Sequence, residues 1–129
     1  MKYCLYETGI YPIKLMVAIS EWNEDDEERK QLEAVITPLS KISLTDTEAI
    51  TFQALYKEDD SYVVCILFNG PQLDDVWAHE ADHFVNMLFI FLEIDMDLHN
   101  DEPHAYLLEW AYNRIRDFFK SYVIEKKKK

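Results

Sequence analysis

The stretch YVVCILFN, residues 62 to 69, constrains the fold more strongly than any other part of this 129-residue chain. It is apolar nearly throughout, which is typical of a strand buried on both faces in the middle of a sheet. The preceding stretch AITFQALY, residues 49 to 56, alternates larger apolar side chains with polar or smaller ones. Because only the polar run KEDDS separates the two stretches, we predict a β-hairpin.

Two helices are predicted after the hairpin. Residues 73–94 contain no Gly or Pro and have a dense apolar second half, which is typical of a helix in the core. A last helix opens near Asp101 or Glu102, with Pro103 in its first turn, where proline is accepted.

The segments ahead of the hairpin are less regular. Residues 11–20 alternate with the period of a strand, and Pro12 makes this strand a candidate for the edge of the sheet. Residues 21–48 show no clear period, and within them residues 24–32 form either a short helix or a loop. We expect an α+β fold, in which a small antiparallel sheet of about three strands (11–20, 49–56 and 62–69) packs on the two helices.

Composition indicates one globular, acidic domain spanning residues 1–125, followed by a disordered basic tail at residues 126–129. The formal net charge is −12, and the four terminal lysines contribute +4 to it, so residues 1–125 carry −16. An acidic body repels phosphate backbones. We therefore expect no nucleic-acid partner, unless the protein mimics DNA.

The two cysteines, Cys4 and Cys65, are too few and too far apart for a disulfide framework or a thiolate zinc site. Both lie in apolar, strand-like stretches, which suits buried free thiols in a reducing compartment. The first residues make a poor signal peptide, and no apolar run approaches the length of a membrane span. A cytoplasmic protein without a membrane partner is expected.

The segment AHEADHF places His79 and His83 four residues apart in the first predicted helix. One turn separates them, so both rings project side by side and can each offer a nitrogen to a tetrahedral Zn²⁺. Glu80 then points beside the metal, where a general base takes a proton from metal-bound water. The alternative is a chance pair of histidines on a packed face. The helical context favours zinc, as does the clustering of all four histidines between His79 and His104.

Glu102, at the mouth of the last helix, is the predicted third ligand. A pattern with a further histidine would need Gly and His at the positions of Asn86 and Phe89, so that subclass is excluded. A role for Glu102 in favouring the dipole of its helix also stays open. Other residues remain candidates for the third ligand: Asp101, His104 and Glu109.

The segments WAHEADHFVNMLFIFLEI and NDEPHAYLLEWAYNRI together resemble the small zincin-like, gluzincin-type metallopeptidases found in phage and prophage genomes. In that family an HExxH helix is followed, after a short connection, by a helix that opens with an E-P-x-A-Y-type signature. The resemblance covers residues 76–115, is weaker around YETGIYP, and is absent between about 21 and 48. It implies His79, His83 and Glu102 as metal ligands and Glu80 as the catalytic acid/base. The chain departs from the family at Asp82, where small residues are common; this side chain faces solvent or accepts a hydrogen bond from a ligand histidine.

A zinc metalloprotease that hydrolyses a peptide bond in a peptide or protein substrate is therefore the expected function. Glu80 would take a proton from water and pass it to the leaving amine. Three side chains can offer the oxyanion a hydrogen bond, namely Tyr106, His104 and His99, and Tyr106 is favoured because it lies one turn after Glu102. An extended substrate is expected to add a strand to an edge of the sheet, with residues 11–20 as the candidate edge.

Two other classes of function remain open. One is a non-catalytic phage module, structural or interacting, that keeps the zinc for stability, in which case four protein ligands are expected. The other is an acidic decoy that mimics DNA and binds a host protein. Such a decoy needs no metal and depends on acidic residues such as those at 24–28.

Overall fold

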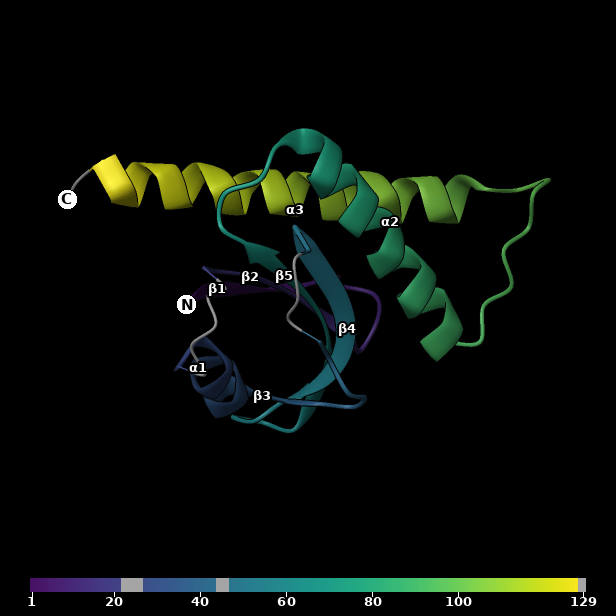
Figure 1. The fold of residues 1–129 in the computed structure, drawn as a ribbon. Coiled ribbons are helices and arrows are strands. Elements are labelled where there is room, and N and C mark those ends of the chain that lie inside the picture. The colour runs from purple at the N-terminus through teal and green to yellow at the C-terminus, as the bar shows by residue number, and fades with distance from the viewer. Residues whose placement is uncertain (22–26, 44–46, 128–129) are drawn as a thin grey trace.

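A computed structural model of the protein describes residues 1–21, 27–43 and 47–127. Within these residues five strands form one mixed sheet in the order β1-β2-β5-β4-β3: β1 (Lys2–Glu7), β2 (Lys14–Ser20), β3 (Ile36–Pro38), β4 (Ala49–Tyr56) and β5 (Ser61–Asn69). The helices are α1 (Glu27–Val35), α2 (Asp74–Phe91) and α3 (Glu102–Lys127). Helices α2 and α3 lie over one face of the sheet, and α1 lies on the other (Figure 1).

The α+β class agrees with the sequence analysis, but the predicted sheet of about three antiparallel strands is wrong. The prediction omits β1 and β3, which form the two edges, and β2 pairs with β5 in parallel from Lys14 opposite Val63 to Ser20 opposite Asn69. Edge strands carry weak signals: β1 is at most half-buried, and β3 has three residues. Parallel pairing is a long-range contact that no local pattern of side chains encodes.

The prediction that residues 11–20 form an edge strand is also wrong. Strand β2 begins at Lys14, after Pro12, and lies between β1 and β5. A turn ahead of it brings β1 alongside, because Thr8 Oγ1 donates to the carbonyl of Tyr11 (3.1 Å) and accepts from its amide (3.0 Å). With β1 antiparallel to it, β2 is almost wholly buried.

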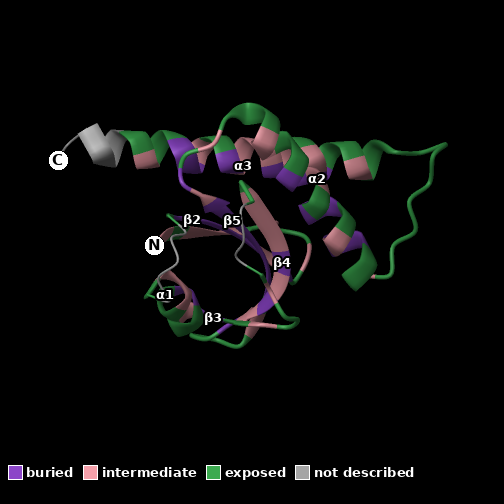
Figure 2. Cartoon of the chain, in the orientation of Figure 1, coloured by how far each residue is buried: buried purple, intermediate pink, exposed green. Residues whose placement is uncertain are grey.

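The predicted hairpin and its central second arm are confirmed. Strands β4 and β5 pair antiparallel, and β5 is the middle strand of the five. Successive side chains of β5 point to opposite faces, so Val64, Ile66 and Phe68 pack with α2 and α3. Val63, Cys65 and Leu67 pack in the second core, where Leu32 is the buried residue of α1. Layers on both faces explain why this stretch is apolar throughout (Figure 2).

Helix α2 is stopped by a left-handed residue. Glu93 has φ 56°, its amide donates to the carbonyl of Ile90 (3.2 Å), and the amide of Ile94 donates to the carbonyl of Phe89 (2.8 Å). This pair of bonds is the Schellman motif, which satisfies carbonyls that the last turn leaves free. An exposed connection then leads to Glu102, with Pro103 in the first turn of α3 as predicted (Figure 2).

The cysteines agree with the expectation of free thiols. Cys65 is fully buried and Cys4 is half-buried. Burial raises the pKa of the Cys65 thiol far above its ordinary value, which keeps it protonated and unreactive.

None of the helices in the described part of the chain combines the length and the apolar character that crossing a membrane requires. Helix α3 continues to Lys127, while residues 128–129 of the predicted disordered tail lie outside the described residues. Most of the acidic run at 24–28 lies outside them too.

Candidate metal centre

Two histidines one turn apart project from α2. Nε2 of His79 lies 3.1 Å from Nε2 of His83, and the ring centroids are 4.7 Å apart in an edge-to-face arrangement. The spacing causes this arrangement, because residues i and i+4 are neighbours on the surface of a helix. Both side chains are exposed, so a ligand can reach the two nitrogens from solvent.

Glu80 lies beside this pair, on the flank of α2 that faces β4. It is 5% exposed, and its Oε2 accepts a hydrogen bond from the hydroxyl of Thr51. One oxygen of Glu80 and one nitrogen of each histidine all lie within 4.8 Å of one another. Among the described residues, no other group of three His, Cys, Asp or Glu side chains is brought together this closely.

The spacing of the two histidine nitrogens fits a zinc ion. A tetrahedral zinc with Zn–N bonds of about 2.0–2.1 Å holds its two nitrogens about 3.3–3.4 Å apart. The two imidazole nitrogens stand 3.1 Å apart, so small ring rotations suffice for both to bind one ion. Two imidazoles are part of the donor set that zinc uses in catalytic sites, and a third protein ligand completes that set.

The structure does not bring Glu102 into this group. Glu102 is the first residue of α3, is exposed, and lines a separate hollow of about 380 Å³ together with Tyr11 and Tyr106. Tyr106 is 70% exposed and lies on the same side of α3 as Glu102, as expected. The carboxylate that does join the histidines is Glu80, which the sequence analysis places beside the metal as a base. The ligand role of Glu102 stays a prediction.

Asp82 and His104 join α2 to α3. Nε2 of His104 lies 3.4 Å from one carboxylate oxygen of Asp82, and the side-chain amide of Asn86 donates to the other oxygen over 3.4 Å. Asp82 therefore lies next to His104 of α3 without a hydrogen bond between them, and it accepts a hydrogen bond from Asn86. His104 is half-buried, with its ring edge-on to Phe89, whereas His99 is exposed in the connection between α2 and α3.

A hollow of about 360 Å³ adjoins His79 and Glu80 on the side of β4. Its other walls come from residues 47–49, where β4 begins, and from the first turn of α2. Glu48 and Asp75 bring two further carboxylates to its rim. A substrate group placed here would lie directly beside His79 and Glu80.

Among the described residues, no strand pairs with the outer edge of the first half of β4, which lies next to the same side chains. Strand β3 pairs with β4 only from Ala54 to Tyr56, and the amide of Leu39 donates to the outward carbonyl of Gln53 (3.0 Å). In an antiparallel strand every second residue points its backbone groups the same way, so those of Thr51 and Ala49 also point outward. No described residue makes a backbone hydrogen bond to them.

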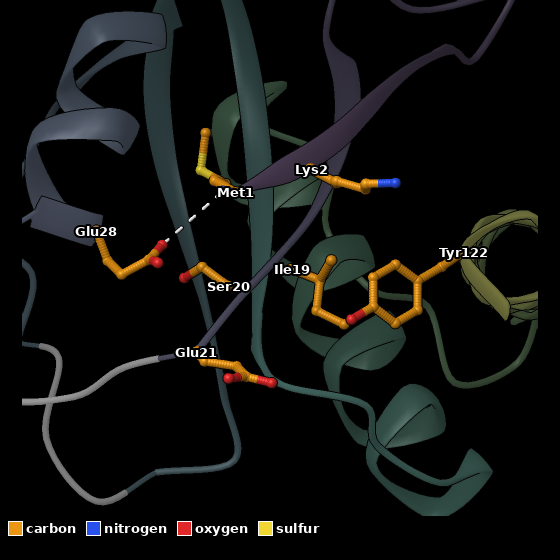
Figure 3. Close-up of a pocket in the computed structure, with 7 residues that line it drawn as sticks. All are labelled: Met1, Lys2, Ile19, Ser20, Glu21, Glu28 and Tyr122. Atoms are coloured by element: carbon orange, nitrogen blue, oxygen red, sulfur yellow. Dashed lines mark ion pairs between the residues drawn. The ribbon is translucent and has the colours of Figure 1, made fainter. Parts of the chain in front are cut away.

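Another hollow, of about 270 Å³, lies at the carboxyl end of β2 (Figure 3). It is bounded by Ser20, Glu28 and Tyr122, among others, and contains no histidine or cysteine. The amino group of Met1 closes one side, because it donates to Gln31 Oε1 (2.7 Å) and lies 3.9 Å from Glu28. Its two carboxylates, Glu21 and Glu28, are not part of any group of three metal-binding side chains among the described residues.

Three residues around the histidines are absent from the sequence analysis: Thr51, Glu48 and Asp75. For Thr51 a signal exists, because Ala49 packs with the cluster beneath α2 and α3 while Phe52 and Ala54 pack on the opposite face. Strand alternation alone therefore places Thr51 on the face of the two long helices. Which helix residue it meets depends on how α2 crosses the sheet, and no local pattern carries that.

Comparison of the chain with protein-family models, with curated proteins and with solved structures found no match.

Proposed function

We propose that the protein is a zinc-dependent metallopeptidase whose centre is built from His79, Glu80 and His83. The observation that carries the proposal is the position of Glu80, a buried carboxylate that lies within 4.8 Å of an exposed pair of histidines and accepts a hydrogen bond from Thr51. An ionised carboxylate is costly to bury unless it has partners, so such an arrangement favours a chemical role for it.

His79 and His83 would hold the ion. Glu102 remains the proposed third ligand, but it lies outside the histidine group in this structure and would have to move toward the pair to bind the same ion. A zinc ion bound there would lower the pKa of its water toward about 7 and polarise the carbonyl to be cleaved. Glu80 takes the proton of the attacking water and delivers it to the leaving amine. Thr51 keeps the Glu80 carboxylate aimed at the histidine pair during both transfers.

The open edge of β4 supports a peptide substrate. An extended chain can pair with the outward backbone groups of Ala49 and Thr51, which would lay a peptide bond beside Glu80. Main-chain pairing accepts many sequences, so this contact holds the substrate while the neighbouring hollow selects side chains. This edge replaces residues 11–20, which the structure places inside the sheet.

The first experiment measures zinc by elemental analysis in untagged protein. Wild type should carry about one zinc per chain, His83→Ala should carry little, and His99→Ala, which alters an exposed histidine outside the group, should match wild type. Absence of zinc from folded wild-type protein would contradict the proposal.

Glu80→Gln then separates the two roles of this residue. If Glu80 is the base, the variant keeps its zinc and loses about 10²- to 10⁴-fold in the hydrolysis of denatured casein. If the variant loses the metal instead, Glu80 is a ligand. Four protein ligands including Glu102 would then make a closed structural site, which is the non-catalytic alternative.

A further inference from the structure

The hollow beside the histidine pair is lined by three acidic side chains. Glu48 stands on one wall, Asp75 on another, and Glu80 on the floor next to His79. In the part of the chain that the structure describes, no lysine or arginine lines the hollow, and neither Glu48 nor Asp75 forms an ion pair. Their negative charge is therefore available to a ligand.

The two rim carboxylates sit on anchored backbone. Asn69, the last residue of β5, donates from its backbone amide to the carbonyl of Glu48 (2.9 Å) and from its side chain to the carbonyl of Thr47 (3.2 Å). Asp75 belongs to the first turn of α2, in which the amides of Val76 and Trp77 both donate to the carbonyl of Leu73 (3.1 and 3.3 Å). The backbone that carries both charges is thus held in place before any ligand arrives, which lowers the entropy lost on binding.

Strand β4 connects the hollow to Glu80, the proposed general base. Ala49 lines the hollow and also presents outward backbone groups, and two residues on, Thr51 contacts Glu80. A peptide paired with this stretch of β4 would therefore place one of its side chains, or its terminus, over Glu48 and Asp75. Successive residues of an extended peptide alternate sides, so only particular positions reach the hollow.

We propose that this hollow is a specificity subsite for a positively charged group of the peptide substrate. The group is a lysine or arginine side chain, or the amino terminus, held beside the bond on which Glu80 acts. The inference rests on the proposed peptidase function and adds its substrate class. Complementary charge in a walled hollow raises both the affinity for a cation and the rate of encounter, most strongly at low ionic strength.

The test uses fluorescent peptides with identical sequences apart from one central residue, which is lysine, norleucine or glutamate. All three are blocked at both ends, and a fourth is the norleucine peptide with a free amino terminus. Dissociation constants come from fluorescence anisotropy at low salt, read before any cleavage product accumulates. The proteins are wild type, the rim variant Glu48→Gln/Asp75→Asn, and the control Glu33→Gln/Asp74→Asn, which removes the same charge at exposed residues outside the hollow.

Wild type should bind the lysine peptide about threefold to tenfold more tightly than the norleucine peptide, as expected for two partly exposed ion pairs. The rim variant should lose this preference and the control should keep it. If only the free amino terminus confers the gain, the subsite reads the terminus of the substrate. Equal binding of the charged and neutral peptides, no binding of any peptide, or a preference that survives in the rim variant overturns the inference. The inference is also overturned if the control variant loses the preference for the lysine peptide as much as the rim variant does, because the net charge of the protein then explains the preference.

Mass spectrometry of the same samples separates this inference from the proposed function. Cleavage without a preference for positive charge would support the proposed peptidase function and contradict the proposed subsite. Charge-selective binding without cleavage, in protein that contains zinc, would support the proposed subsite and contradict the proposed peptidase function.

Discussion

Glu80 and Thr51 form the contact on which the proposed chemistry depends, although 29 residues separate them in the chain. A carboxylate that is 5% exposed has lost most of its water, and the Thr51 hydroxyl replaces part of that hydration with a fixed hydrogen bond. His79 and His83 need no such partner, because both rings remain in solvent. At the residue scale, the histidines are arranged by helix periodicity and the carboxylate by packing against β4.

Replacing Thr51 with valine should therefore destabilise the protein beyond what a loss of volume explains. The variant keeps the shape of the side chain but leaves the Glu80 carboxylate without its donor, at a cost of about 1–3 kcal/mol in the free energy of unfolding. Thr51→Ser, which keeps the hydroxyl, should lose clearly less. Urea denaturation at neutral pH measures both. Equal stability of the valine and serine variants would show that the hydrogen bond contributes nothing.

Helix α2 is the element that arranges the centre, and its two ends are built differently. At its beginning, Asp74 and Asp75 place negative charge on the positive end of the helix dipole. At its end, Glu93 adopts the left-handed conformation that the Schellman motif requires, although glutamate disfavours it. The helix therefore stops at a residue that local propensity does not predict, and the prediction of a helix through residue 94 is a few residues too long.

Glu93→Gly should stabilise the protein, because glycine adopts a positive φ without steric cost. Relief of about 1–2 kcal/mol of strain, less the entropy that glycine adds to the unfolded chain, leaves a net gain of about 0.5–1 kcal/mol. Glu93→Ala removes the same charge without relieving the strain and serves as the control. Thermal or chemical denaturation compares the two, and a glycine variant no more stable than the alanine variant would argue against a left-handed Glu93.

At the scale of the whole molecule, a sheet covered on both faces carries a strongly acidic surface. Two separate apolar clusters hold the layers together, one beneath α2 and α3 and the other beneath α1. The formal net charge of −12 opposes this compact state, because like charges repel across a small body. The same charge reduces any attraction to nucleic acids.

Salt should accordingly raise the melting temperature. Between about 0.01 M and about 1 M sodium chloride the Debye length falls from about 30 Å to about 3 Å, which screens the repulsion between surface carboxylates. We expect a gain of about 1 kcal/mol, or roughly 4 °C, measured by circular dichroism. A variant with Glu33→Lys and Glu109→Lys, both at exposed positions, should show a smaller gain. A melting temperature that stays constant or falls with salt would mean that charge repulsion is not a significant destabilising force.

Features that depend on neighbouring residues along the chain can be predicted from local sequence patterns. Alternation and the run KEDDS predict the β4–β5 hairpin, an unbroken apolar run predicts the central position of β5, and helical spacing brings His79 and His83 together. These features follow from the periods of strand and helix, which repeat every few residues.

Only the tertiary structure decided the rest. The parallel pairing of β2 with β5, the edge strands β1 and β3, the contact of Thr51 with Glu80, and the placement of Glu102 outside the histidine group all join or separate distant residues. Such contacts are set by how whole layers pack, because many partners satisfy the same local pattern and burial of the entire core selects among them.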